Sequence, residues 1–297
     1  MKKVLFATTA LVATAGIASA DVSLSGYAEI GMADTGSGDM QFHSDMDVNF
    51  KLSGATDNGL SFGATIDLDE VSGGIGANGG AGTNAEAVFV SGSFGTITMG
   101  DTDGALDWAM TETAIGGTIS DDETVHAGYN GNAGLDGDAD GQILRYNHSV
   151  GALGFAVSME QAGNGGAGDD ITAAGVTYGT DMGGMGVALG LGTQKAGDDD
   201  LTGLSVKVTS GAYTFIANTT DGDVAGADTS HVGLGFGYTM NALTVGVNWG
   251  ENEVAGVKAD GFAVAVNYDL GGGAVAQFGY SDDDAGDTMS FGLGLSF

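Results

Sequence analysis

Apolar and polar residues alternate along most of the chain that follows residue 20. The last segment is the clearest case, with Met289, Phe291, Leu293, Leu295 and Phe297 separated by Ser and Gly. Because successive side chains of a strand point to opposite faces, such a segment has one apolar face and one small, polar face. The recurrence of this pattern predicts a protein built from antiparallel strands.

Sixteen segments carry the alternation, and most approach the roughly 9–11 residues that a tilted strand needs to cross a bilayer. The predicted strands cover residues 22–32, 42–53, 60–70, 85–92, 95–101, 142–150, 153–160, 171–179, 184–193, 201–209, 212–219, 229–239, 242–250, 259–269, 272–280 and 288–297. After residue 20 the sequence has no apolar run long enough for a transmembrane helix, and lipid admits only helices and closed barrels. We therefore expect an all-β protein, a 16-stranded antiparallel transmembrane β-barrel that occupies residues 21–297 as one domain.

The predicted connections differ in length on the two sides of the barrel. Long ones are expected at 33–41, 71–84, 101–141, 161–170, 194–200, 220–228, 251–258 and 281–287, and the others are short. Short periplasmic turns and longer external loops are typical of outer-membrane barrels. Tyr238 and Tyr268 end outward rows before short turns, and Trp249 and Tyr280 end them before long loops. This placement predicts an aromatic girdle at each bilayer interface.

The first twenty residues have the composition of a secretory signal peptide. Lys2 and Lys3 precede a short apolar stretch, and Ala18-Ser19-Ala20 is a small-residue cleavage pattern. We expect residues 1–20 to be removed, so that the mature protein begins at Asp21. The chain has no cysteine, so this exported protein is expected to fold without disulfides.

Acidic residues dominate the charge of the chain. It contains 39 Asp and Glu against seven Lys and Arg, for a formal net charge of −32 at neutral pH. A nucleic-acid partner is excluded on this basis, because both molecules would be polyanions. Cations are the expected companions of such a surface.

The longest predicted connection, 101–141, is rich in acids and contains no Lys or Arg. Its acids are Asp101, Asp103, Asp107, Glu112, Asp121, Asp122, Glu123, Asp136, Asp138 and Asp140. It also holds Trp108, Ile115, Ile119 and Leu135, enough apolar residues to pack against something. We interpret it as a loop that folds into the lumen, narrows it with carboxylates and selects for cations. The alternative is a solvated external loop.

Few basic side chains remain in the mature chain. Lys51 and Lys207 fall on the polar faces of their strands, and His43 shares the face of Lys51. We expect the Arg145 side chain to point into the lumen as well, because an Arg that faces lipid would cost about 2–4 kcal/mol at the bilayer midplane. These four residues could form a cationic wall opposite the acidic loop and set a transverse field. Alternatively, each one offsets nearby carboxylates.

Residues 136–141, DGDADG, match the opening of a calcium-binding loop. The closing Glu is missing, since the twelfth position is Asn147, and an EF-hand is therefore rejected. Weak calcium binding by Asp136, Asp138 and Asp140 and an ordinary acidic loop remain equal alternatives. No cofactor is expected to be required.

Enzyme signatures are missing from the sequence. It contains no Cys, no H-E-x-x-H zinc motif and no G-x-S-x-G nucleophile elbow. Carboxylate pairs are too numerous for any one pair to indicate acid–base catalysis. We therefore predict that the protein is not an enzyme.

Several stretches of the chain resemble the general diffusion porins of Gram-negative bacteria, most closely those of Rhodobacter-like alphaproteobacteria. They are residues 21–27 (DVSLSGY), 50–64 (FKLSGATDNGLSFGA), 90–101 (VSGSFGTITMGD) and 268–273 (YDLGGG), together with the terminal Phe297. The resemblance implies a homotrimer in the outer membrane, surrounded by lipid and lipopolysaccharide. It also implies passive passage of small hydrophilic solutes and ions, a third loop folded into the pore with its acids at the constriction, and calcium at acidic loop sites.

This chain departs from the resembled porins in its few basic residues. Those porins usually set a cluster of Arg and Lys against the acidic loop, so we expect a stronger cation preference here. An alternative function is a secreted or surface calcium-binding β protein, rich in Gly and Asp, without channel activity. Tandem G-G-x-G-x-D repeats, which such a protein would need, do not recur in the sequence.

Overall fold

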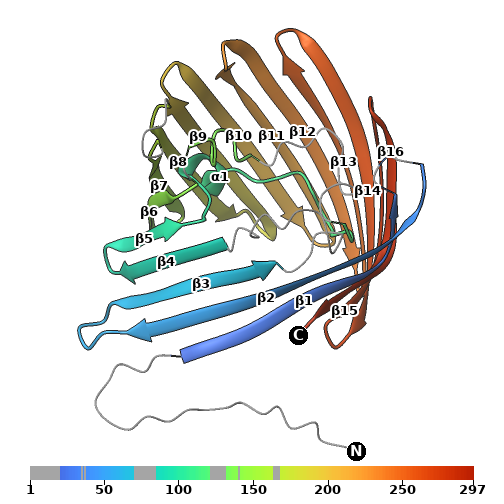
Figure 1. Cartoon of the computed structure of the whole chain (residues 1–297), viewed down its shortest axis with the longest axis horizontal. Coiled ribbons are helices and arrows are strands. Elements are labelled where there is room, and N and C mark those ends of the chain that lie inside the picture. The colour runs from blue at the N-terminus through green and yellow to red at the C-terminus, as the bar shows by residue number, and fades with distance from the viewer. Residues whose placement is uncertain are drawn as a thin grey trace, which may run out of the picture.

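Sixteen antiparallel strands close into a barrel in the computed structural model, which describes residues 21–34, 36, 38–69, 85–120, 132–139, 141–162 and 168–297. Each strand pairs with its sequence neighbours, and β1 pairs with β16 to close the ring (Figure 1). The elements are β1 (Asp21–Asp34), β2 (Gln41–Ala55), β3 (Ser61–Asp69), β4 (Ala85–Gly92), β5 (Gly95–Gly100), α1 (Ala105–Ala109), β6 (Ile143–Val150), β7 (Leu153–Glu160), β8 (Ile171–Asp181), β9 (Met185–Ala196), β10 (Asp199–Ser210), β11 (Tyr213–Val224), β12 (Ala227–Met240), β13 (Leu243–Val254), β14 (Val257–Gly271), β15 (Ala274–Asp283) and β16 (Gly286–Ser296). The predicted fold class is confirmed, whereas the signal peptide predicted at residues 1–20 lies outside the described residues.

The strand registers confirm that the alternation separates an outer face from a lumen face. Leu24, Phe50 and Ile66 lie side by side on β1, β2 and β3, and Leu24 is 65% exposed. The neighbouring row places Asn49 beside Asp67 on the other face. Apolar rows remain exposed because lipid is their solvent, while the polar rows line the interior. No helix in the described part of the chain is long and apolar enough to cross a bilayer.

Four of the predicted long loops are instead two-residue turns, so those predictions, 194–200, 220–228, 251–258 and 281–287, were wrong. Between β11 and β12, for example, only Ala225 and Gly226 connect the strands, with φ of 53° and 76°. Two residues with positive φ form the type of turn that matches the twist of a hairpin. The sequence conceals these strand ends because both faces of a strand become polar once it leaves the lipid.

The third long connection folds into the barrel, as the sequence predicts. We call its described first part, residues 101–120, the belt. Its helix α1 packs on β7, β8 and β9, and the backbone N–H of Thr111 then donates to Ser205 of β10 over 3.0 Å. The N–H of Gly117 donates to Asn267 of β14 over 2.8 Å. The belt therefore follows the lumen wall past many strands, as the trace that leaves α1 shows in Figure 1.

Small lumen-facing residues leave the space in which the belt backbone packs against the strands. A Cβ on Gly190 of β9 would overlap the carbonyl oxygen of Ala109, and one on Gly246 of β13 would overlap that of Ile115. Ala263 and Ala265 of β14 are likewise almost completely buried. The small residues of the alternating pattern thus let the belt backbone lie directly on the strands.

We predict that Gly190→Ala loosens the belt, because the new methyl group must push the Ala109 carbonyl from the wall. Overpacking of this kind costs about 1–3 kcal/mol. The temperature at which the folded band on an SDS gel converts to the unfolded band should fall. Gly179→Ala on β8 is the matched control, since a Cβ there meets nothing within 4 Å. Equal conversion temperatures for the two variants would contradict the prediction.

Candidate functional site

The first residues of the belt bring several of the predicted acids together near the guanidinium of Arg145. Asp101, Asp103, Asp107 and Asp136 are among the residues that line a recess of about 520 Å³. Arg145, on β6, donates from Nη1 to the backbone carbonyl of Asp103 and lies 3.7 Å from its carboxylate. The register pairs Arg145 with Thr98 and Ser158 on the lumen face, so its side chain points inward as expected.

Asp107, on α1, has the most perturbed acidity in this recess. Burial, followed by repulsion from Asp103 and Glu112, raises its pKa to about 7, although Arg145 acts in the opposite direction. A carboxyl with this pKa is largely neutral at pH 6 and largely ionised at pH 8. The charge at the base of the belt therefore depends on pH near neutrality.

Asp136 acts as a structural acceptor rather than as a free lumen charge. Its carboxylate accepts hydrogen bonds from the backbone N–H of Gly104, over 2.7 Å, and from Nε2 of Gln194. Burial raises the pKa of Asp136 to about 6, and the bond from Gly104 partly opposes that rise. Asp136 thus ties the returning segment, residues 132–139, to the start of the belt.

The segment predicted to bind calcium wraps the carboxylate of Glu160 with its backbone. Glu160 of β7, only 1% exposed, accepts the backbone N–H groups of Gly137, Ala139 and Gly141 over 2.7–3.2 Å. Three converging amides favour an anion. Within the described ranges, no group of three His, Cys, Asp or Glu side chains is arranged to hold a metal ion. Asp140 lies outside those ranges and Asp138 is exposed, so calcium binding by Asp136, Asp138 and Asp140 stays a prediction.

The four basic residues do not form a single cationic wall, and this expectation is corrected. His43 and Lys51 are on β2, Arg145 is on β6 and Lys207 is on β10, and these three strands follow one another at about a quarter of the ring. Lys51 and Lys207 do face the lumen, since Lys51 pairs with Ser23 and Lys207 shares the face of Ser205. His43 is engaged with a buried carboxylate, because its Nε2 lies 3.0 Å from Oε2 of Glu29.

Acids outnumber the basic residues on the wall that carries His43 and Lys51. The register sets Asp45 beside Glu29 and Asp47 beside Tyr27, and Asn49 pairs with Asp67 of β3. The lumen face of β1 to β3 is therefore acidic on balance. Sequence reasoning missed Glu29 and Asp67, although both fall on the polar parity of their strands, because it considered each strand separately.

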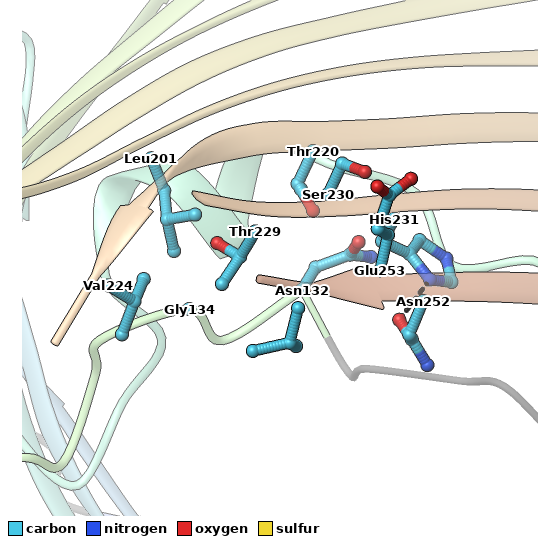
Figure 2. Close-up of a pocket in the computed structure, with 11 residues that line it drawn as sticks. Asn132, Gly134, Leu201, Thr220, Val224, Thr229, Ser230, His231, Asn252 and Glu253 are labelled. Atoms are coloured by element: carbon cyan, nitrogen blue, oxygen red, sulfur yellow. Dashed lines mark hydrogen bonds between the residues drawn. The ribbon is translucent and has the colours of Figure 1, made fainter. Parts of the chain in front are cut away.

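The wall of β10 to β13 contributes a recess whose lining is mostly uncharged, with Glu253 as its acid. Together with the returning segment it encloses a recess of about 260 Å³ (Figure 2). Asn132 and Gly134 come from the returning segment, and the strands contribute Leu201, Thr220, Val224, Thr229, Ser230, His231, Asn252, Glu253 and Val254. Figure 2 shows His231 bonded to Asn252, with 2.7 Å between Nδ1 and Oδ1. Among the described residues, acids are thus sparser at this recess than on the belt and on β1 to β3.

The other predicted constriction acids are only partly covered by the structure. Glu112 lies on the belt and is exposed, as are Asp101 and Asp103. Asp121, Asp122 and Glu123 lie outside the described residues. Glu160 and Gln194 anchor the loop but were not predicted. Both stand at the outer ends of strands, where alternation no longer separates the two faces.

A closed barrel with an apolar exterior, a polar lumen and an inward loop defines a transmembrane diffusion channel. The comparisons with known proteins agree: residues 7–288 match the model of the Gram-negative porin family. The chain belongs to this family, and its place is the outer membrane of a Gram-negative bacterium. Members of the family are channels rather than enzymes.

Individual relatives support this assignment. A porin of Rhodobacter capsulatus is 32% identical over 319 residues, covering 93% of this chain and 99% of that protein. A porin structure refined at 1.8 Å resolution is 26% identical, with a TM-score of 0.74, and covers 93% of this chain and 100% of that one. A triple mutant of the Rhodopseudomonas blastica porin has the same coverage with 18% identity and a TM-score of 0.67, which shows the fold alone.

We predict that cation permeability relative to anion permeability rises with pH around neutrality, and that Asp107→Asn removes part of this rise. The pKa of Asp107 is raised to about 7, so its carboxyl is neutral below that pH and charged above it. Reversal potentials in planar bilayers, measured between about pH 6 and 8, test this. A variant profile that coincides with the parent profile would exclude Asp107 from the ion path.

Proposed function

We propose that this porin is a cation-preferring channel for small hydrophilic solutes. The observation that carries the proposal is that acids face the lumen from both sides. Asp101 and Asp103 lie on the belt, and Asp47 and Asp67 lie on the wall of β2 and β3. Rings of carboxylates of this kind favour cations in water-filled pores.

The few basic residues of the lumen do not cancel this charge. Arg145 lies beside Asp103, and His43 is held by Glu29. Lys51 and Lys207 stand on separate walls, β2 and β10. Cations entering the lumen therefore meet a negative potential, which raises their local concentration and lowers that of anions.

The proposal includes a homotrimer embedded in outer-membrane lipid and lipopolysaccharide, as the resemblance to other porins implies. Exposed apolar side chains on the outer face of β1 and β2 support it, because lipid or a neighbouring subunit must cover them. Val22, Leu24 and Phe42 are 69%, 65% and 92% exposed in the single chain. Light scattering of the detergent-solubilised protein should give the mass of three chains, and a monomer mass would contradict this part.

A bilayer with a salt gradient tests the ion preference directly. The parent channel should give a reversal potential of the sign expected for cations. Asp47→Asn combined with Asp67→Asn should lower the cation-to-anion permeability ratio about fivefold, since two unit charges ~8 Å away in water are together worth about 1 kcal/mol. Anion preference of the parent would overturn the proposal.

Asp284→Asn serves as the control for the loss of charge. Asp284 is exposed and lies in the two-residue turn between β15 and β16. Its substitution should leave the permeability ratio unchanged. An equal drop with this variant would mean that overall charge, rather than the lumen acids, sets the preference.

A further inference from the structure

The far end of the belt is held by a group of side chains on β1 and β2. The backbone N–H of Ser120 donates to Oε2 of Glu29 over 3.0 Å, and the Tyr27 hydroxyl donates to Oε1 over 3.0 Å. Nε2 of His43 lies 3.0 Å from the same Oε2 and 3.2 Å from the Ser120 nitrogen. We call Tyr27, Glu29, His43 and the Ser120 amide the clasp.

Glu29 is the common acceptor of the clasp. It is only 3% exposed, so its carboxylate depends on these donors in place of water. Hydrogen bonds to an ionised carboxylate are stronger than those between neutral groups. If His43 carries its proton on Nε2 and donates to Glu29, the Ser120 amide donates to Glu29 alone. Removal of the carboxylate would then leave that partly buried amide without its acceptor.

The clasp lies on the opposite side of the barrel from the start of the belt. At that start, the N–H of Ala105 donates to Oγ of Ser158 on β7 over 2.8 Å. The clasp stands on β1 and β2, which the ring order separates from β7 by several strands in either direction. Beside it, Ile119 is fully buried, with its Cδ1 over Gly31 of β1 and Gly292 of β16. The belt thus spans the lumen wall between two fixed ends.

We propose that Glu29 is a positioning residue that keeps the channel open by fixing the Ser120 end of the belt to the wall. Without it, the last residues of the belt would lean into the lumen and narrow it intermittently. His43 then supports the clasp instead of acting as a free pore charge. This inference rests on channel activity, but not on the proposed cation preference.

A single-cysteine reporter tests the proposal. The chain contains no cysteine, and Ser120→Cys keeps the backbone N–H that Glu29 accepts. We expect the introduced thiol to react with a charged, water-soluble methanethiosulfonate at least about tenfold faster in the Glu29→Ala background, because the orphaned amide releases the segment. Glu29→Gln, which removes the same charge but keeps a carbonyl that accepts the Ser120 amide, controls for the change in local charge and should leave the rate near that of Ser120→Cys alone.

Single-channel recordings supply the second measurement. Glu29→Ala should close to lower conductance levels about tenfold more often than the parent, and Glu29→Gln should restore most of the parent behaviour, because its carbonyl still accepts the Ser120 amide. If Glu29→Ala does not assemble, His43→Ala takes its place, with a smaller increase expected. Labelling and closure rates equal to those of the parent in a folded barrel would overturn the proposal. If the parent channel proved to prefer anions, the proposed cation preference would fail, but the comparison of Glu29→Ala with the parent in these two measurements would still stand.

Discussion

Closure of the hydrogen-bonded ring is the constraint on which the rest of the structure depends. In lipid, every backbone N–H and C=O must find a partner within the protein, so a sheet that crosses the membrane cannot have a free edge. The pairing of β1 with β16 removes that edge, and it continues to the last residue, where Phe297 N–H donates to the carbonyl of Gly26 over 2.9 Å. Once the ring is closed, each strand has one face toward lipid and one toward water.

The closed ring also explains why the inward loop is held mainly through its backbone. Loop amides need partners wherever the belt shields them from water, and the lumen wall supplies them from Ser158, Ser205, Asn267 and Glu29. Small residues between these anchors let the backbone approach the strands. The described belt therefore lies along the wall, with its backbone in direct contact with the strands.

The acids of this protein have two physical roles, which their number alone does not distinguish. Glu29, Asp136 and Glu160 accept backbone amides and hold the loop in place. Asp101 and Asp103 remain exposed, and the proposed cation preference depends on such exposed acids. The formal charge of −32 therefore overstates the charge that is available to act on ions, because part of it belongs to acids that hold the loop.

The sequence by itself determined the barrel, the number of strands and the inward loop. Alternation is a local property, and the apolar Ile119 and Leu135 within an acidic connection already required a surface to pack on; both are buried. Only the tertiary structure decided which acids are structural, where the outer strand ends lie and how the basic residues are distributed. Those features depend on side chains that meet across strands far apart in the sequence, such as Glu29 with Ser120 and Glu160 with Gly137. The pattern along a single strand does not predict these contacts, because they depend on the closure of the ring and on the path of the loop inside it.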